Sequence, residues 1–274
     1  MLNYKTTSTD FLVSSNPNAG AKNINSLGSQ FDIVFDKAYV YDEKARSIKL
    51  EVLESEMYYN SRNIDSVRYN NHRIRIDGPN ELTGVVQSAI IVIPNGLYEP
   101  ASLNNALQLL LNNAGFKLNM IAITGNDPIN RIQITFNYVN ASVHFNNADY
   151  HGFADLLGFG YNIVAPAVAG EIKTAPNLAT FNKVNYYIIT SNITGNATII
   201  NGQASHAIAR ILIRASPNYQ IQNEPAYPYT FDITYLRGQS VRRLTFQLRD
   251  DSGELIDTLG EAWSVRYRIT YEYN

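Results

Sequence analysis

One stretch of the chain, Ile90 to Gly160, limits the possible folds more than any other, because it places a well-marked helix among strand-like segments. Between Leu103 and Ala114, apolar residues recur at the three- and four-residue spacing of a single helix face. Pro100 suits the first helical turn, where its missing N–H costs no hydrogen bond, and Gly115 suits the left-handed residue that ends a helix. The pattern predicts a helix from about Pro100 to Ala114.

The helix belongs to a compact segment of about seventy residues, which is long enough for a small domain. After it, alternating apolar residues predict a strand at 132–138, and residues 153–157 predict a short helical turn that Gly158 ends. We therefore expect an inserted α+β subdomain at residues 91–163.

Strand patterns dominate the rest of the chain. The last is the clearest, because five apolar residues from Val265 to Tyr273 alternate with Arg266, Arg268, Thr270 and Glu272, which fixes one register. Further period-two segments or apolar runs occupy residues 31–35, 48–52, 72–76, 90–93, 184–190, 207–214, 229–236 and 241–249. Turn signals at Asn201-Gly202 and Asp251-Ser252-Gly253 predict hairpins.

These strands lack repeated βα units, which favours a mainly β fold: an antiparallel jelly-roll sandwich with the α+β subdomain inserted. The jelly roll is expected to be discontinuous, at residues 30–90 and 164–274. A compact double jelly roll is the structural alternative. Residues 1–29 are rich in Ser, Asn, Thr and Gly and carry little periodic apolar content, so we expect a flexible N-terminal arm there. The arm is expected either to be a disordered terminus or to become ordered against a neighbouring subunit.

Composition excludes several classes of function. The chain has no Cys, which removes disulfides, thiol nucleophiles and Cys-ligated metals. Its formal net charge of −2 gives no general attraction to phosphate backbones, so specific nucleic-acid binding is not expected. No run of 18 apolar residues occurs, so we expect no membrane span.

The motifs of catalysis and cofactor binding are not found, and we expect no enzyme, catalytic residue, cofactor or bound metal. The histidines, His72, His144, His151 and His206, lack metal-ligand spacing and are assigned ordinary polar roles. Asp250, Asp251, Glu254 and Asp257 crowd one turn but do not match a calcium loop, so a solvated hairpin tip is expected.

Arginines recur on the presumed outer faces of the strands. They are either solvated or lie at a subunit interface opposite carboxylates such as Asp32, Glu51 or Glu272. The candidate interface residues are Arg73, Arg75, Arg242, Arg243, Arg266 and Arg268.

Several longer motifs carry a family resemblance: EMYYNSRNI at 56–64, IPNGLYEPASLNNAL at 93–107, FADLLGFG at 153–160, YYIITSNITGNATIINGQ at 186–203 and LTFQLRDDSGELIDTLGEAWSVRYRITYEY at 244–273. Through the order and spacing of these motifs, the chain resembles the penton and minor capsid proteins of icosahedral jelly-roll double-stranded DNA viruses, including virophages and polinton-like viruses. The resemblance implies a non-catalytic virion protein. It also implies a homopentamer at the capsid vertices that docks against the major capsid protein.

Two other classes of function stay open. Jelly rolls also serve as carbohydrate- or receptor-binding modules, in which exposed Tyr and Trp stack on sugar rings and a host receptor would be the partner. Trp263, the only Trp, lies at the start of an alternating strand, so core or rim packing suits it better than a sugar platform. A glycosidase with two carboxylates on a β-sandwich is the third class.

Overall fold

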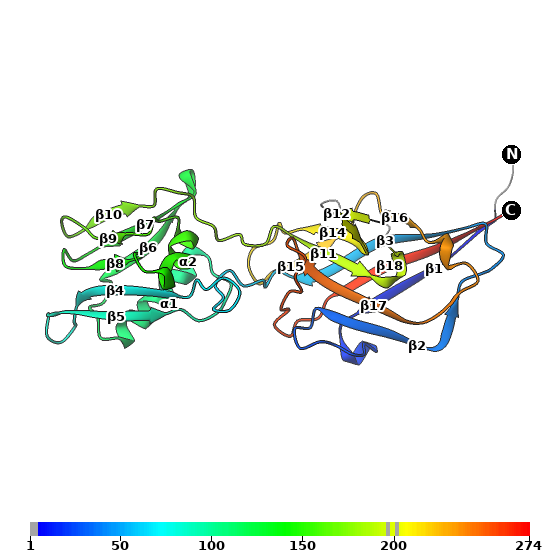
Figure 1. Cartoon of the computed structure of the whole chain (residues 1–274), viewed down its shortest axis with the longest axis horizontal. Coiled ribbons are helices and arrows are strands. Elements are labelled where there is room, and N and C mark those ends of the chain that lie inside the picture. The colour runs from blue at the N-terminus through cyan, green and yellow to red at the C-terminus, as the bar shows by residue number, and fades with distance from the viewer. Residues whose placement is uncertain (1–4, 196–197, 201–202) are drawn as a thin grey trace. The chain divides into compact units, whose positions relative to one another are not determined.

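The computed structural model describes residues 5–195, 198–200 and 203–274 (Figure 1). The chain forms two compact units. The larger unit comprises Met1–Ser61 and Val184–Asn274, and the smaller one Arg62–Lys183. Each has its own sheets and its own buried apolar residues.

The described part of the larger unit contains two large antiparallel sheets and one two-stranded hairpin. The first has the order β1-β18-β3-β15, and β16 also pairs with β3. The bounds of its strands are β1 Lys5–Ser14, β18 Ser264–Tyr273, β3 Ser47–Tyr58, β15 Gln220–Asn223 and β16 Tyr229–Asp232. The second has the order β14-β11-β17-β2, with bounds β14 Ala207–Leu212, β11 Tyr186–Ser191, β17 Ser240–Asp250 and β2 Gln30–Val40.

The connections between these sheets give a jelly roll. In chain order, β1, β3, the β15–β16 pair and β18 lie in the first sheet, while β2, β11, β14 and β17 lie in the second. The chain crosses between sheets at nearly every connection, which is the arrangement of an eight-stranded jelly roll when β15 and β16 share one position. The predicted fold class, an antiparallel jelly-roll sandwich, is confirmed.

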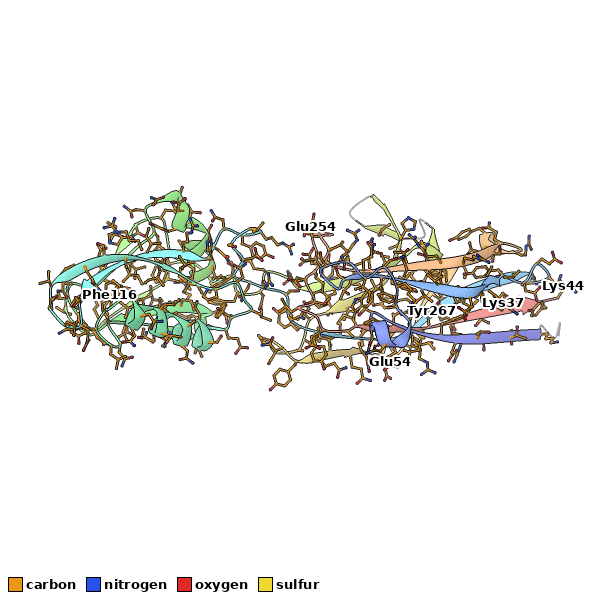
Figure 2. All side chains as sticks on the ribbon, turned by 90° about the horizontal axis from the view of Figure 1, so that it is seen from below. Lys37, Lys44, Glu54, Phe116, Glu254 and Tyr267 are labelled. Carbon is orange, nitrogen blue, oxygen red and sulfur yellow. The ribbon has the colours of Figure 1, made fainter. Side chains whose placement is uncertain are left out.

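Aromatic side chains fill the space between the two sheets. Phe31 of β2 lies 5.5 Å from Phe246 of β17 and 5.0 Å from Trp263, measured between ring centroids. Tyr267 of β18 stacks on Phe11 of β1 at 5.0 Å, and Figure 2 shows it inside the jelly roll. Because strand side chains alternate between faces, the apolar positions of β18 supply this core while its arginines face outward.

The predicted flexible arm is wrong for residues 5–14, which form β1. Ten consecutive residues pair with β18, from Lys5 opposite Tyr273 to Ser14 opposite Ser264. Phe11 and Val13 reach the core, whereas Lys5–Asp10 is exposed on both faces. The segment lacks apolar alternation because most of this edge strand has little to bury.

The remaining elements of the larger unit are short. The hairpin strands β12 (Thr198–Ile200) and β13 (Gln203–Ser205) pair antiparallel, and the turn predicted at Asn201-Gly202 lies outside the described residues. Single turns of 3-10 helix occur in both units: η1 Pro17–Ala19, η2 Asp127–Ile129, η3 Asn192–Thr194 and η4 Thr234–Leu236.

The smaller unit combines two antiparallel sheets with two helices. One sheet has the order β5-β4-β8-β9, with bounds β5 Val86–Val92, β4 Arg73–Pro79, β8 Ser142–His144 and β9 Ile163–Val164. The other has the order β10-β7-β6, with bounds β10 Glu171–Thr174, β7 Arg131–Phe136 and β6 Ile121–Asn126. The helices are α1 Pro100–Asn113 and α2 Ala148–Leu157. α1 packs on β5 and β6, and α2 packs on β4.

The apolar face and the end residues of helix α1 are those that its sequence predicts. Leu103, Leu107 and Leu111 are buried in the core of the unit. Pro100 occupies the first turn, and Gly115 just beyond the helix has φ +78°. α2 starts earlier than predicted because Asn147 caps it by accepting the backbone N–H of Asp149.

The structure also moves the boundaries of the insertion. The smaller unit begins at Arg62 and ends at Lys183, rather than at residues 91 and 163. The reason is pairing: β4 bonds to β5 and β8, and β10 bonds to β7, so residues assigned by sequence to the jelly roll complete the sheets of the insertion. The insertion thus connects β3 to β11.

Candidate subunit interface

Two of the predicted interface arginines, Arg266 and Arg268, are held by Asp10 on the outer face of the first sheet. Arg268 donates from Nε and Nη2 to the Asp10 carboxylate at 2.7 and 3.2 Å, and Arg266 donates from Nη2 at 3.0 Å. These hydrogen bonds hold the pKa of Asp10 at about 2, Arg268 contributing more than Arg266. The arginines therefore fasten β1 to β18 within one chain.

The same arginines have acidic residues on their other side. In the β18–β3 register, Arg266 faces Glu54 and Arg268 faces Glu51. Figure 2 shows Glu54 on the outside of the jelly roll. Around these arginines, the outer face therefore presents Asp10 of β1, Arg266 and Arg268 of β18, and Glu51 and Glu54 of β3 in succession, so these charges are largely balanced within the chain.

Arg243 and Arg242 lie on β17 in the second sheet. Arg243 Nε is 3.4 Å from Oδ2 of the buried Asp32, which also accepts hydrogen bonds from Asn23 and Thr245. Arg242 is exposed at an irregularity in the β17–β2 register, and among the described residues it forms no ion pair. Of these two arginines, Arg242 is the one free to meet a carboxylate of another molecule.

Arg73 and Arg75 belong to the smaller unit, on the outer face of β4. Arg75 Nε lies 3.2 Å from Asp77 Oδ1, whereas Arg73 is exposed and has no ion partner among the residues described. Partial burial alone would raise the pKa of Asp77. The hydrogen bonds from Ser88 and Arg75 outweigh this effect and lower that pKa.

His144 lies beside this pair, and its geometry bears on catalysis. Its Nε2 is 2.8 Å from Asp77 Oδ2 and 3.1 Å from Ser142 Oγ. A Ser-His-Asp triad needs the serine and the aspartate on opposite ring nitrogens, so that one orients the imidazole while the other exchanges a proton. Here both meet the same nitrogen, and the cluster is a polar contact between β4 and β8.

The other sites examined by sequence have structural roles. Asp250 is buried, and its Oδ1 accepts hydrogen bonds from Ser252 Oγ and from the backbone of Ser252 and Glu254, so the acidic turn is organised around a buried carboxylate and is less solvated than expected. Within the described ranges, no group of three His, Asp or Glu residues could hold a metal ion. No helix described here is both long and apolar enough to cross a membrane.

Trp263 is unavailable for stacking on a ligand. It is 2% exposed, and its Nε1–H donates to the backbone oxygen of Gly28 at 3.1 Å. The core role that its strand position favours is the one it has.

The two lateral sides of the jelly roll differ, a feature that the sequence did not reveal. On one side, β14 and β15 border a groove of about 450 Å³ lined by Arg210, Arg214, Glu224 and Tyr229. Arg210 lies over the Tyr186 ring at 4.0 Å, and the Tyr229 hydroxyl donates to the Arg210 backbone oxygen at 3.1 Å. The other side is formed by the edge strands β1 and β2.

The chain resembles a known protein in its fold and not in its sequence. No protein-family model matches the chain, and no curated protein matches it in sequence. Among solved structures, the selenomethionine-labelled penton protein of mavirus matches with a TM-score of 0.51 and 12% sequence identity, over 98% of this chain and 100% of that one. At this identity, the likeness shows that the two proteins share a fold.

Proposed function

We propose that this chain is a structural protein of a virus capsid, a penton or minor capsid subunit that forms a homopentamer at capsid vertices and docks against the major capsid protein. The observation that carries the proposal is the fold: a single jelly roll with an inserted unit between β3 and β11, matched over nearly its whole length by a viral penton protein.

The lateral surfaces of the jelly roll suit a ring. A closed ring needs a heterologous contact, in which one surface of each copy meets a different surface of the next. The groove beside β14 and the edge formed by β1 and β2 are two such different surfaces. Among the candidate arginines of the jelly roll, Arg242 is our main candidate for an ion pair between copies, because Arg243, Arg266 and Arg268 already contact acidic residues of their own chain.

The oligomeric state tests this proposal. One chain weighs 30.7 kDa, so light scattering coupled to gel filtration at micromolar concentration should give five times that mass, and negative-stain images should show rings. Arg242→Glu should raise the concentration at which half of the chains are in rings at least tenfold. The same charge reversal at the exposed Lys44, in the loop after β2, should leave it unchanged. A chain that stays monomeric at 100 µM and is missing from purified particles would contradict the proposal.

A further inference from the structure

Strand β5 carries a dense stripe of exposed apolar side chains. On its outer face, Val86, Ile90 and Val92 are 50%, 58% and 50% exposed, and Val85 and Leu82 in the hairpin before them are 66% and 94% exposed. Apolar patches of this kind on a folded surface mark sites of association.

This strand is also an unpaired sheet edge, at the outside of its sheet in Figure 1. The Ile93 N–H donates to His72 O at 2.7 Å and the Asn80 N–H to Val85 O at 2.8 Å, which identifies the hydrogen-bonded pairs between β4 and β5. Because such pairs alternate in an antiparallel ladder, the backbone groups of Val86, Ser88, Ile90 and Val92 point away from β4.

Two other edges of the chain are protected in ways that β5 is not. Residues near Lys22 pair with part of the β2 edge, and Pro225 and Pro228 separate the short strands β15 and β16. The β5 sequence, VQSAIIV, has no charge, no proline and no glycine. Natural proteins use charges and prolines to keep sheet edges apart, so an edge without them is a template for another strand.

The strand is complementary to itself. If two copies of β5 pair antiparallel about Ala89, all seven residues overlap, Val86 faces Val92 of the second copy, and Ser88 faces its Ile90. Every outward backbone group then bonds across the junction. In this pairing the two β4 strands lie three strand spacings apart, so Arg73 and Arg75 of one copy are at least about 14 Å from those of the other, which exceeds the screening length of about 8 Å at physiological salt.

From these observations we propose that β5 of one chain pairs with β5 of a second copy, joining two four-stranded sheets into one. This contact goes beyond the proposed function. A two-fold contact uses the same surface on both partners and cannot itself generate a five-fold ring. It therefore joins two separate chains or two separate rings.

The mass of the full chain, measured at concentrations between 1 and 500 µM, tests the inference. The range extends this high because a single-strand interface is smaller than a standard protein interface. The mass should double, from whichever species is present at low concentration. Ile90→Lys should raise the midpoint of this doubling at least tenfold, and the exposed side chain should let the variant keep its melting temperature. Thr124→Lys, at an exposed position on edge strand β6 of the same unit, is the matched control and should double like the unaltered chain.

Cross-linking tests the register without relying on Ile90→Lys. Because the chain has no Cys, Ser88→Cys and Ile90→Cys introduce single thiols. Under oxidising conditions, a mixture of the two variants should give more disulfide-linked dimer than either variant alone, since directly opposed strand residues lie within disulfide reach. A mass that does not double by 500 µM, or mixed cross-linking no higher than that of Thr124→Cys, would overturn the inference. A ring with five times the chain mass that never doubles would refute only the β5 contact.

Discussion

Helix α1 offers a direct test that the smaller unit has its own core, because the same substitution can be made on its buried and exposed faces. Leu107 is fully buried in that core, whereas Leu109 is 62% exposed. Leu107→Ala removes about three buried carbon groups and leaves a cavity, a combination that typically costs about 2–5 kcal/mol of unfolding free energy. Leu109→Ala should stay within about 0.5 kcal/mol, because it changes an exposed side chain to a good helix former.

For a unit of this size, about 4 °C of melting temperature is lost per kcal/mol, so Leu107→Ala should lower the melting temperature of the smaller unit by about 8–20 °C. Far-UV circular dichroism or calorimetry records that transition. Fluorescence of Trp263, the only Trp and a residue buried in the jelly roll, records the other unit separately. The Trp263 transition should not move with Leu107→Ala. Equal effects of the two substitutions, or a Trp263 transition that falls as far as the dichroism signal, would refute the assignment of Leu107 to a separate core.

Three further substitutions test the attachment of β1 to β18 and the packing at the C-terminal end of α2. The pKa of Asp10 is lowered to about 2, so its contribution to stability should be complete above about pH 4 and be lost as the pH falls towards 2. Asp10→Asn should remove this pH dependence from urea unfolding curves. The substitution should cost less than about 1 kcal/mol of unfolding free energy, because the ion pair is exposed. Gly158 and Gly170 both have left-handed φ, +80° and +83°, but an added Cβ would lie 2.5 Å from Asn177 O at Gly158 and would meet nothing within 4 Å at Gly170. Gly170→Ala should cost about 1 kcal/mol. Gly158→Ala should cost about 2–3 kcal/mol more in thermal unfolding, and equal losses would show that the Asn177 contact is unimportant.

Periodicity predicted the elements that bury one continuous face. The alternation in β18 and the spacing of Leu103, Leu107 and Leu111 are local properties, and both elements form where expected. β10 and β15 escaped prediction because each is four residues long and contains a single apolar residue, which gives no alternation. The boundaries of the insertion could not be predicted for a different reason. β4 has the same alternation whether it pairs in the jelly roll or in the smaller unit, and only its pairing with β5 and β8 shows that it belongs to the smaller unit.

The candidate interface was harder to predict than the fold. Sequence named six arginines as interface candidates but could not tell which of them already contact acidic residues of the same chain. Asp32 binds Arg243 from a position more than two hundred residues away, and Glu51 faces Arg268 across the β18–β3 ladder. The stripe on β5 went unnoticed because Ile90 and Ile91 read as one continuous buried run. In the structure, Ile91 is buried and Ile90 is exposed.

The first strand shows what a topological argument could have added. A jelly roll in which β18 lies inside its sheet requires a strand on each side of β18, and Arg266 and Arg268 on its outer face favour an acidic residue opposite them. Among residues 1–29, Asp10 is the only acidic residue, and the apolar run Phe11–Val13 follows it directly. A strand through Asp10 therefore pairs with the second side of β18, places a carboxylate opposite Arg266 and Arg268, and adds apolar side chains to the core. That combination distinguishes it from an arm, although no single stretch of its sequence alternates clearly.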